Sequence, residues 1–266
     1  MNQNLRQLNI EEIKKREIDI ISEIDKFCRN NNIRYSIIGG TLIGAVRHQG
    51  FIPWDDDIDI AMTRENYEKF NKLYKSNKYK ILTYQSTPNY YYSYIKVVDK
   101  NTVIFEKNLK NFEDNGIFID IFPIDKVQEN LKEIKRINII GKIRNIAVTN
   151  KETIKNKKIL QKILYPILKN INVQKLCKYM DKIAQKNEKQ NLMMCGTIVA
   201  GSSNEKNIVP IELFEDYVDL KFENLNLMAV KNYDKFLRII FGEYMKLPPK
   251  EQQISNHSFD AYMREV

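Results

Sequence analysis

The amino-acid sequence predicts an α+β fold in which a mixed sheet is covered by helices on one face. Helical and strand-like segments alternate up to about residue 125, which is typical of such a core. The composition, 43% hydrophobic and 11% aromatic over 266 residues, supports a buried interior. A lysine-rich helical stretch then interrupts the mixed pattern. We therefore expect a catalytic core at 1–125, a basic helical subdomain at 126–207 and a segment at 208–266 that completes the core.

The core is predicted from local patterns. Apolar residues recur at helical spacing over 10–31, which predicts an amphipathic helix. Strand-forming residues over 34–38 end at Gly39 and Gly40, interpreted as a tight turn, and Thr41 is expected to cap a helix up to His48. The other elements expected in the core are a strand over 57–62, a helix over 64–76 capped by Thr63, and strands over 80–84, 92–98, 102–106 and 116–122.

The second half begins with a strongly basic segment. Between residues 126 and 190 there are 17 Lys or Arg against 5 Asp or Glu, a surplus of 12 that exceeds the net charge of +9 for the whole chain. Its apolar residues recur at helical spacing. A solvated charged face is one interpretation, and docking on an anionic membrane surface or a lipid-linked glycan acceptor is the other. After it we expect a hairpin over 218–222 and 225–230, a helix over 233–241 and a proline-broken loop over 242–259.

Composition also excludes several classes of protein. The three cysteines, Cys28, Cys177 and Cys195, are far apart and form no CxxC pair, which argues against zinc and a disulfide framework. The N-terminal stretch is polar, and no window approaches 18 uninterrupted apolar residues, so neither a signal peptide nor a transmembrane span is expected. The expected location is the cytoplasm, with peripheral binding on the inner face of the membrane as a further expectation. Nucleic acid is not expected as a partner, because no binding motif is present.

The stretch 38–62, IGGTLIGAVRHQGFIPWDDDIDIAM, carries the strongest functional signal. Residues two apart on a strand share a face, so Asp55, Asp57 and Asp59 point together while the intervening isoleucines enter the core. Clustered carboxylates repel unless a cation lies between them, and hard oxygen ligands suit Mg²⁺ or Mn²⁺. The pattern favours a metal site at Asp57 and Asp59. A solvated acidic turn is the alternative, and Asp55 and Asp56 are left without a firm role.

The same stretch offers phosphate ligands. Backbone N–H groups at a glycine-rich helix start can approach a phosphate closely, which makes Gly39, Gly40 and Thr41 candidates. Arg47 and His48 are candidates for further donors to the same phosphates. An ordinary glycine loop is the alternative.

Acidic and basic residues on later strands complete the candidate site. Asp120 lies inside the apolar run of GIFIDIFPID, where an unpaired carboxylate is costly, so a metal ion or a paired cation is expected beside it. Asp120 is interpreted as a metal ligand or general base, and a structural hydrogen-bonding role is the alternative. Asp125 is interpreted as a turn or helix-cap residue after Pro123. Lys96 is either a phosphate ligand near the acids or a surface lysine beside a hairpin turn. Four tyrosines either pack in the core or form an aromatic cage for a quaternary ammonium group: Tyr90, Tyr91, Tyr92 and Tyr94.

Three motifs together resemble the LicD family, whose relatives include the fukutin-type proteins: GGTLIGAVRHQGFIPWDDDIDIAM, GIFIDIFPID and YDKFLRIIFGEYMKLPP. The resemblance covers about the first 125 and the last 50 residues. It implies a nucleotidyltransferase-like fold and the transfer of phosphocholine, or of phosphoribitol or phosphoglycerol, from a CDP-alcohol donor to a sugar hydroxyl of a cell-surface glycan, such as lipopolysaccharide or a teichoic-acid-type precursor. Carried over by position, the family's metal acids fall on Asp57, Asp59 and Asp120.

Two other functions remain open from the sequence. A nucleotidyltransferase would keep this fold but move a nucleoside monophosphate from an NTP to a small acceptor. A catalytically inert protein that binds a membrane surface through its basic helices belongs to another class, and the intact set of acids argues against it.

Overall fold

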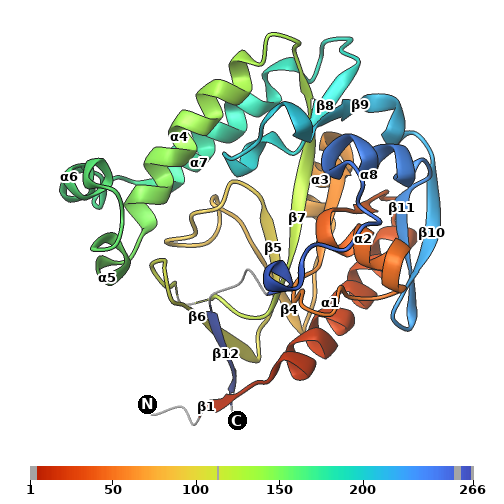
Figure 1. Cartoon of the computed structure of the whole chain (residues 1–266), viewed down its shortest axis with the longest axis horizontal. Coiled ribbons are helices and arrows are strands. Elements are labelled where there is room, and N and C mark those ends of the chain that lie inside the picture. The colour runs from red at the N-terminus through yellow and green to blue at the C-terminus, as the bar shows by residue number, and fades with distance from the viewer. Residues whose placement is uncertain (1–4, 113, 255–258, 265–266) are drawn as a thin grey trace.

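The computed structural model describes residues 5–112, 114–254 and 259–264, and it confirms a mixed α+β fold (Figure 1). The helices are α1 Ile10–Asn30, α2 Gly39–His48, α3 Arg64–Leu73, α4 Lys132–Val148, α5 Lys151–Ile154, α6 Ile159–Leu168, α7 Val173–Ala184 and α8 Tyr233–Phe241. The strands are β1 Leu5–Gln7, β2 Ser36–Ile37, β3 Asp59–Thr63, β4 Tyr79–Leu82, β5 Ile95–Asp99, β6 Thr102–Glu106, β7 Phe118–Val127, β8 Met194–Gly196, β9 Ile208–Pro210, β10 Tyr217–Phe222, β11 Leu225–Val230 and β12 Phe259–Arg264.

The central sheet has the strand order β2-β3-β7-β5-β4, with β8 and β9 added beside the end of β7. β3 and β7 run parallel, whereas β2, β5 and β8 pair antiparallel with their neighbours. The parallel pair sets Asp59 in register with Asp120. Two smaller sheets complete the fold, the hairpin β10-β11 and the sheet β1-β12-β6.

Helices α1 and α3 lie side by side on one face of the central sheet. Their contact is aromatic: the ring of Phe27 meets those of Phe70 and Tyr74 edge-on at 5.8 and 5.1 Å. Asp125 of β7 points toward this face, because its carboxylate binds Arg64 at the start of α3. Residues an odd number of positions apart on a strand point to opposite faces, so Asp120 lies on the other face. The predicted acids therefore lie on the face that α1 and α3 leave open.

The basic segment forms a helical layer with its own small core. α4 packs along α7 (Figure 1), and apolar side chains from both helices join strand residues in a cluster that includes Ile137, Met180 and Tyr94. The segment is not purely helical, since β8 returns to the central sheet within it.

Several predicted elements need correction. Gly39 and Gly40 are the first residues of α2 and not a turn before it, because Gly39 has a φ of +59° and changes the chain direction itself. Thr41 therefore lies inside the helix and does not cap it. Thr63 is at the cap position of α3, but its side chain makes no capping hydrogen bond.

The prediction for Asp125 is wrong. β7 continues to Val127, and Asp125 is completely buried within it. On one edge, β7 pairs with β5 up to Ile121 and with β8 from Asp125 onward. Pro123 lies in the gap between these two partners, so the strand can continue through it without losing a hydrogen bond on that edge. β1, β8, β9 and β12 were not predicted; each is short or lies at an end of the described chain.

A buried ion cluster ties the central sheet to the basic segment. Arg64 donates from Nε and Nη2 to the two carboxylate oxygens of Asp125, both at 2.7 Å, and from Nη1 to Asp181 of α7 at 3.0 Å. Burial raises the pKa of the Asp125 carboxyl to about 7, against the opposing effect of the Arg64 guanidinium. The second oxygen of Asp181 accepts a hydrogen bond from the hydroxyl of Tyr84 at 2.8 Å.

Replacing Arg64 by Met should destabilise the fold by about 3–5 kcal/mol, because two buried carboxylates lose their cation. Glu68→Gln is the matched control: Glu68 contacts the same guanidinium at 3.3 Å but is half exposed, so its loss should change the free energy of unfolding by less than about 1 kcal/mol. Urea unfolding followed by circular dichroism measures both, and equal effects of the two changes would contradict the assignment.

Candidate functional site

Two carboxylates meet on the face of the central sheet opposite α1 and α3. Asp59 and Asp120 are register partners on the parallel strands β3 and β7. The alternation expected along the acidic stretch is present, since Ile58 and Ile60 are fully buried while Asp57 and Asp59 are half-buried. Asp57 precedes β3 and shares the side of Asp59 by this alternation. The fold thus brings the predicted acids Asp59 and Asp120 together, and Asp57 lies two residues before Asp59.

Lys96 supplies the cation next to these acids. It lies on β5 opposite Asp120, and its Nζ is 2.6 Å from Asp120 Oδ1. The side chain is only 2% exposed, which rules out the alternative of a surface lysine. The ammonium group also lies 3.2 Å from the ring centre of Phe118 and 4.8 Å from that of Tyr92. Lys96 is therefore held in an aromatic surrounding with Asp120 as its counter-ion.

The tyrosines near Lys96 mainly pack against one another. Tyr90, Tyr91 and Tyr94 are buried, and the hydroxyl of Tyr90 donates to the backbone carbonyl of Tyr94 at 2.8 Å. Burial raises the pKa of Tyr92 and Tyr94 well above its ordinary value, so both hydroxyls stay protonated. These rings form a core wall beside the site, and Lys96 already occupies the faces of two of them.

The N-terminal turn of α2 lies against the acids. A Cβ placed on Gly39 would lie 3.5 Å from Asp59 Oδ2, and one placed on Gly40 would overlap the carboxylate of Asp55. Thr41 accepts a hydrogen bond from the backbone N–H of Asp59 at 2.9 Å. The missing Cβ at Gly40 thus makes room for the Asp55 carboxylate, whereas Gly39 is favoured by its positive φ and a Cβ there would only touch Asp59. Both carboxylates lie near the helix start, where the helix dipole favours negative charge.

Arg47 and His48 lie at the opposite end of α2. At 1.5 Å per residue they are about 12 Å along the helix from the Gly39–Gly40 end. Arg47 donates to the backbone carbonyl of Tyr244 and to Nε2 of His48, both at 2.9 Å. Arg47 and His48 therefore lie away from Gly39 and Gly40. Of the predicted phosphate ligands, these two have the least support from the structure. The second histidine of the sequence, His257, lies outside the described residues.

The acids fit a magnesium ion that is completed by substrate. Among the described residues, no group of three or more His, Cys, Asp or Glu side chains is arranged to hold a metal ion by itself. Mg²⁺ in phosphate-transferring sites usually uses one or two carboxylates, with waters and substrate phosphates as its other ligands. The Asp59 and Asp120 pair is sufficient for that mode of binding.

A small pocket opens beside Gly39 and was not predicted. Its volume is about 120 Å³, and its walls come from the start of α2, the end of β7, β8, β9 and α8. The lining includes Gly39, Gly196, Thr197, Asn207, Phe236 and Phe241. Few polar groups among apolar walls are typical of small-molecule sites. Most of the wall residues come after position 190, where α8 was predicted but the short strands β8 and β9 were not.

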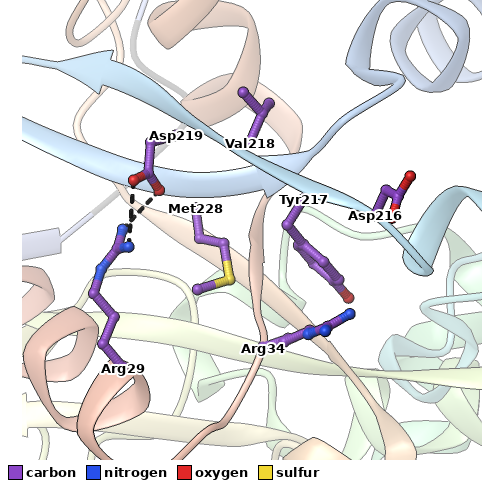
Figure 2. Close-up of a pocket in the computed structure, with 7 residues that line it drawn as sticks. All are labelled: Arg29, Arg34, Asp216, Tyr217, Val218, Asp219 and Met228. Atoms are coloured by element: carbon purple, nitrogen blue, oxygen red, sulfur yellow. Dashed lines mark hydrogen bonds and ion pairs between the residues drawn. The ribbon is translucent and has the colours of Figure 1, made fainter.

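A larger pocket of about 410 Å³ lies against the β10-β11 hairpin (Figure 2). None of the predicted site residues lines it. Its cations already have partners: Arg29 binds Asp219 at 2.7 Å, as Figure 2 shows, and Arg34 donates to the backbone carbonyl of Glu215 at 2.8 Å. We interpret these contacts as anchors of the hairpin to α1 and β2.

Comparison with known proteins points to one family. The family model described as LicD/FKTN/FKRP, nucleotidyltransferase domain, matches residues 32–165. The chain is 28% identical to the lipopolysaccharide cholinephosphotransferase LicD of Haemophilus influenzae over 275 residues, covering 97% of this chain and all of that protein. It is also 33% identical over 139 residues to an uncharacterized protein of Rickettsia typhi, covering 50% of this chain and 44% of that one.

Replacing Thr41 by Val should destabilise the fold by about 1–3 kcal/mol, because the N–H of Asp59 loses its acceptor at a half-buried site. Thr41→Ser keeps the hydroxyl and should recover most of that loss. Chemical denaturation of both variants measures the difference, and equal stabilities would show that the hydrogen bond is unimportant.

The His48 ring should titrate below its ordinary pKa of 6.5: although the residue is exposed, partial desolvation of the ring and the neighbouring Arg47 both disfavour its charged form. The folded chain then binds this proton more weakly than the unfolded chain, so His48 lowers stability as the pH falls through 6.5. In Arg47→Gln the pKa of His48 should rise toward 6.5 without reaching it, since the partial desolvation of the ring remains. NMR titration of the ring protons measures this pKa, and the spectrum is simple to assign because the chain has 2 histidines. A pKa that is the same in the wild type and in Arg47→Gln would exclude the effect of Arg47.

Proposed function

The chain belongs to the LicD/FKTN/FKRP family, and on that premise we propose that it is an enzyme that transfers a phospho-alcohol from a CDP-linked donor to a sugar hydroxyl of a cell-surface glycan. Phosphocholine is the first candidate for the transferred group, because the relative that matches over its whole length is named a cholinephosphotransferase. Phosphoribitol and phosphoglycerol are the other candidates. Lipopolysaccharide and teichoic-acid-type precursors are the acceptors we consider.

The observation that carries the proposal is the register of Asp59 and Asp120 beside the glycine start of α2. Phosphoryl transfer needs positive charge near the phosphates and accurate placement of donor and acceptor. We propose that Asp57, Asp59 and Asp120 hold Mg²⁺ or Mn²⁺ together with the donor phosphates. When bound, the ion neutralises phosphate charge and lowers the pKa of a nearby hydroxyl.

Other groups around the acids are proposed to orient Asp120, to bind the donor phosphates and to bind the nucleoside. We propose that Lys96 orients Asp120 through their ion pair and that its positive charge also stabilises the donor phosphates; its ion pair and its contact with the Phe118 ring support the first role. The backbone of Gly39, Gly40 and Thr41 forms the helix end that faces the donor. We propose that the pocket beside Gly39 receives part of the nucleoside end of the donor, because it is mainly apolar and one of its lining residues, Gly39, lies against Asp59.

The proposed reaction is a displacement at phosphorus. The acceptor hydroxyl oxygen bonds to the phosphorus that carries the alcohol, the bond from that phosphorus to CMP breaks, and CMP leaves with the electron pair. Asp120 is our candidate to accept the hydroxyl proton, since its carboxylate lies within the site and is oriented by Lys96.

The family model also carries the description nucleotidyltransferase domain, which keeps a second function in view. In that reaction an acceptor attacks the α-phosphate of an NTP, and pyrophosphate leaves in place of CMP. The two functions differ in donor and product while using the same acids.

The protein is proposed to act in the cytoplasm, in peripheral contact with the inner face of the membrane. Among the residues that the structure describes, no helix is long and apolar enough to cross a membrane. Contact with lipid would therefore be made from the surface.

Asp59→Asn and Asp120→Asn should each reduce turnover by about 10³-fold or more, because each removes one carboxylate charge from the metal and phosphate site. CMP release from CDP-choline, CDP-ribitol and CDP-glycerol with Mg²⁺, and pyrophosphate release from CTP, are measured in parallel. Asp219→Asn is the control and should keep full activity, because Asp219 pairs with Arg29 on the hairpin and touches none of the proposed site residues in the contacts that the structure gives. Wild-type rates in both site variants would refute the assignment, and pyrophosphate as the product would select the second function.

Thermal unfolding with each donor identifies the ligand independently of turnover. A donor that binds the native state raises the melting temperature, and EDTA should remove that shift if binding needs the metal. A shift that survives EDTA would contradict the metal-bridged donor.

A further inference from the structure

Helix α6 exposes apolar side chains instead of burying them. Ile159, Leu160, Ile163 and Ile167 are 76%, 66%, 63% and 72% exposed, and no residue of the helix is buried. Figure 1 shows α6 with α5 at the far end of the basic segment, away from the central sheet. A surface helix of a globular protein normally turns its apolar residues inward, so the orientation of α6 needs a separate explanation.

The exposed residues form one continuous stripe. Ile159, Ile163 and Ile167 are four residues apart, and Leu160 lies next to this row, so together they cover about a third of the helix circumference. The residues on the other side, which include Leu164 and Leu168, are half-buried, and α6 contacts α4 and α5. The helix is thus fixed to the protein by one side while its more apolar side faces outward.

Lysines surround the stripe. Between residues 151 and 169 there are six Lys and one acidic residue, Glu152. Lys155, Lys157, Lys158 and Lys162 are all exposed. An apolar stripe with lysines at its borders matches an anionic lipid surface, where acyl chains receive the stripe and head groups meet the lysines.

We propose that α6 lies in the plane of an anionic membrane surface, with the stripe of Ile159, Leu160, Ile163 and Ile167 inserted between lipids and the neighbouring lysines at the head groups. A second copy of the chain is a poorer occupant, because pairing the same face would bring two groups of six lysines together. The contact would hold the enzyme next to an acceptor carried by lipid. The proposed membrane contact depends only on α6 and the neighbouring lysines, so it does not require that the donor be a CDP-alcohol.

The test is flotation of the whole protein with vesicles. We expect binding to vesicles of phosphatidylcholine and phosphatidylglycerol, weak binding to phosphatidylcholine alone, and a loss of binding at high salt. Ile163→Ser with Ile167→Ser should weaken binding by about tenfold or more, because both side chains leave the apolar stripe. Met193→Ser with Ile254→Ser is the matched control, since these residues are 65% and 63% exposed outside α6, and it should bind like the wild type.

A fluorescent label shows whether the stripe itself enters the lipid. Ile163→Cys can be labelled selectively, because Cys28, Cys177 and Cys195 are buried and burial raises the pKa of each thiol. An environment-sensitive dye at this position should shift to shorter wavelength on vesicles, whereas one at Ile254→Cys should not.

Absence of vesicle binding by a folded protein would overturn the proposal. So would unchanged binding of the Ile163→Ser and Ile167→Ser variant, since the lysines alone would then account for it. Sedimentation velocity without lipid tests the alternative of a second copy. If the wild type is a dimer and the Ile163→Ser and Ile167→Ser variant is a monomer, the stripe is a contact between two copies of the chain and the proposal is wrong.

Discussion

The structure depends on placing two carboxylates side by side on parallel strands. The β3 and β7 pair sets Asp59 next to Asp120, and uncompensated charges there would repel each other and oppose strand pairing. Compensation comes from two directions. Lys96 pairs with Asp120 from the neighbouring strand, and the N-terminal turn of α2 lies against Asp59 through Gly39. The two carboxylates, the glycines at the start of α2 and the buried lysine therefore form one electrostatic arrangement.

Local patterns were sufficient for the elements that build this arrangement. The period-2 alternation around Asp57 and Asp59, the helical period of α1 and the hairpin β10-β11 all lie within short windows, so the sequence predicts them well. Asp120 was identified by the cost of a charge in an apolar run, and that cost is met by Lys96. Lys96 itself was ambiguous, because burial of a lysine depends on which strand comes to lie beside it.

What the sequence did not predict depends on contacts between distant residues. Asp125 follows a proline and was assigned to a turn, since neither the partner Arg64 nor the gap between β5 and β8 is visible locally. The pocket beside Gly39 is built from β8, β9 and α8, more than 150 residues after the glycine. The separation of Arg47 and His48 from the glycines follows from the length of α2, which begins two residues earlier than predicted.

The position of the last strand has a consequence for how the chain is made. β12 lies between β1 and β6 and pairs with both, with Leu5 opposite Arg264. This sheet cannot close until β12 has been synthesised, and contacts of such long sequence separation form late and slowly. During synthesis β6 has an unpaired edge, which is a site for pairing with other nascent chains. Pairing of β12 with β6 removes this edge.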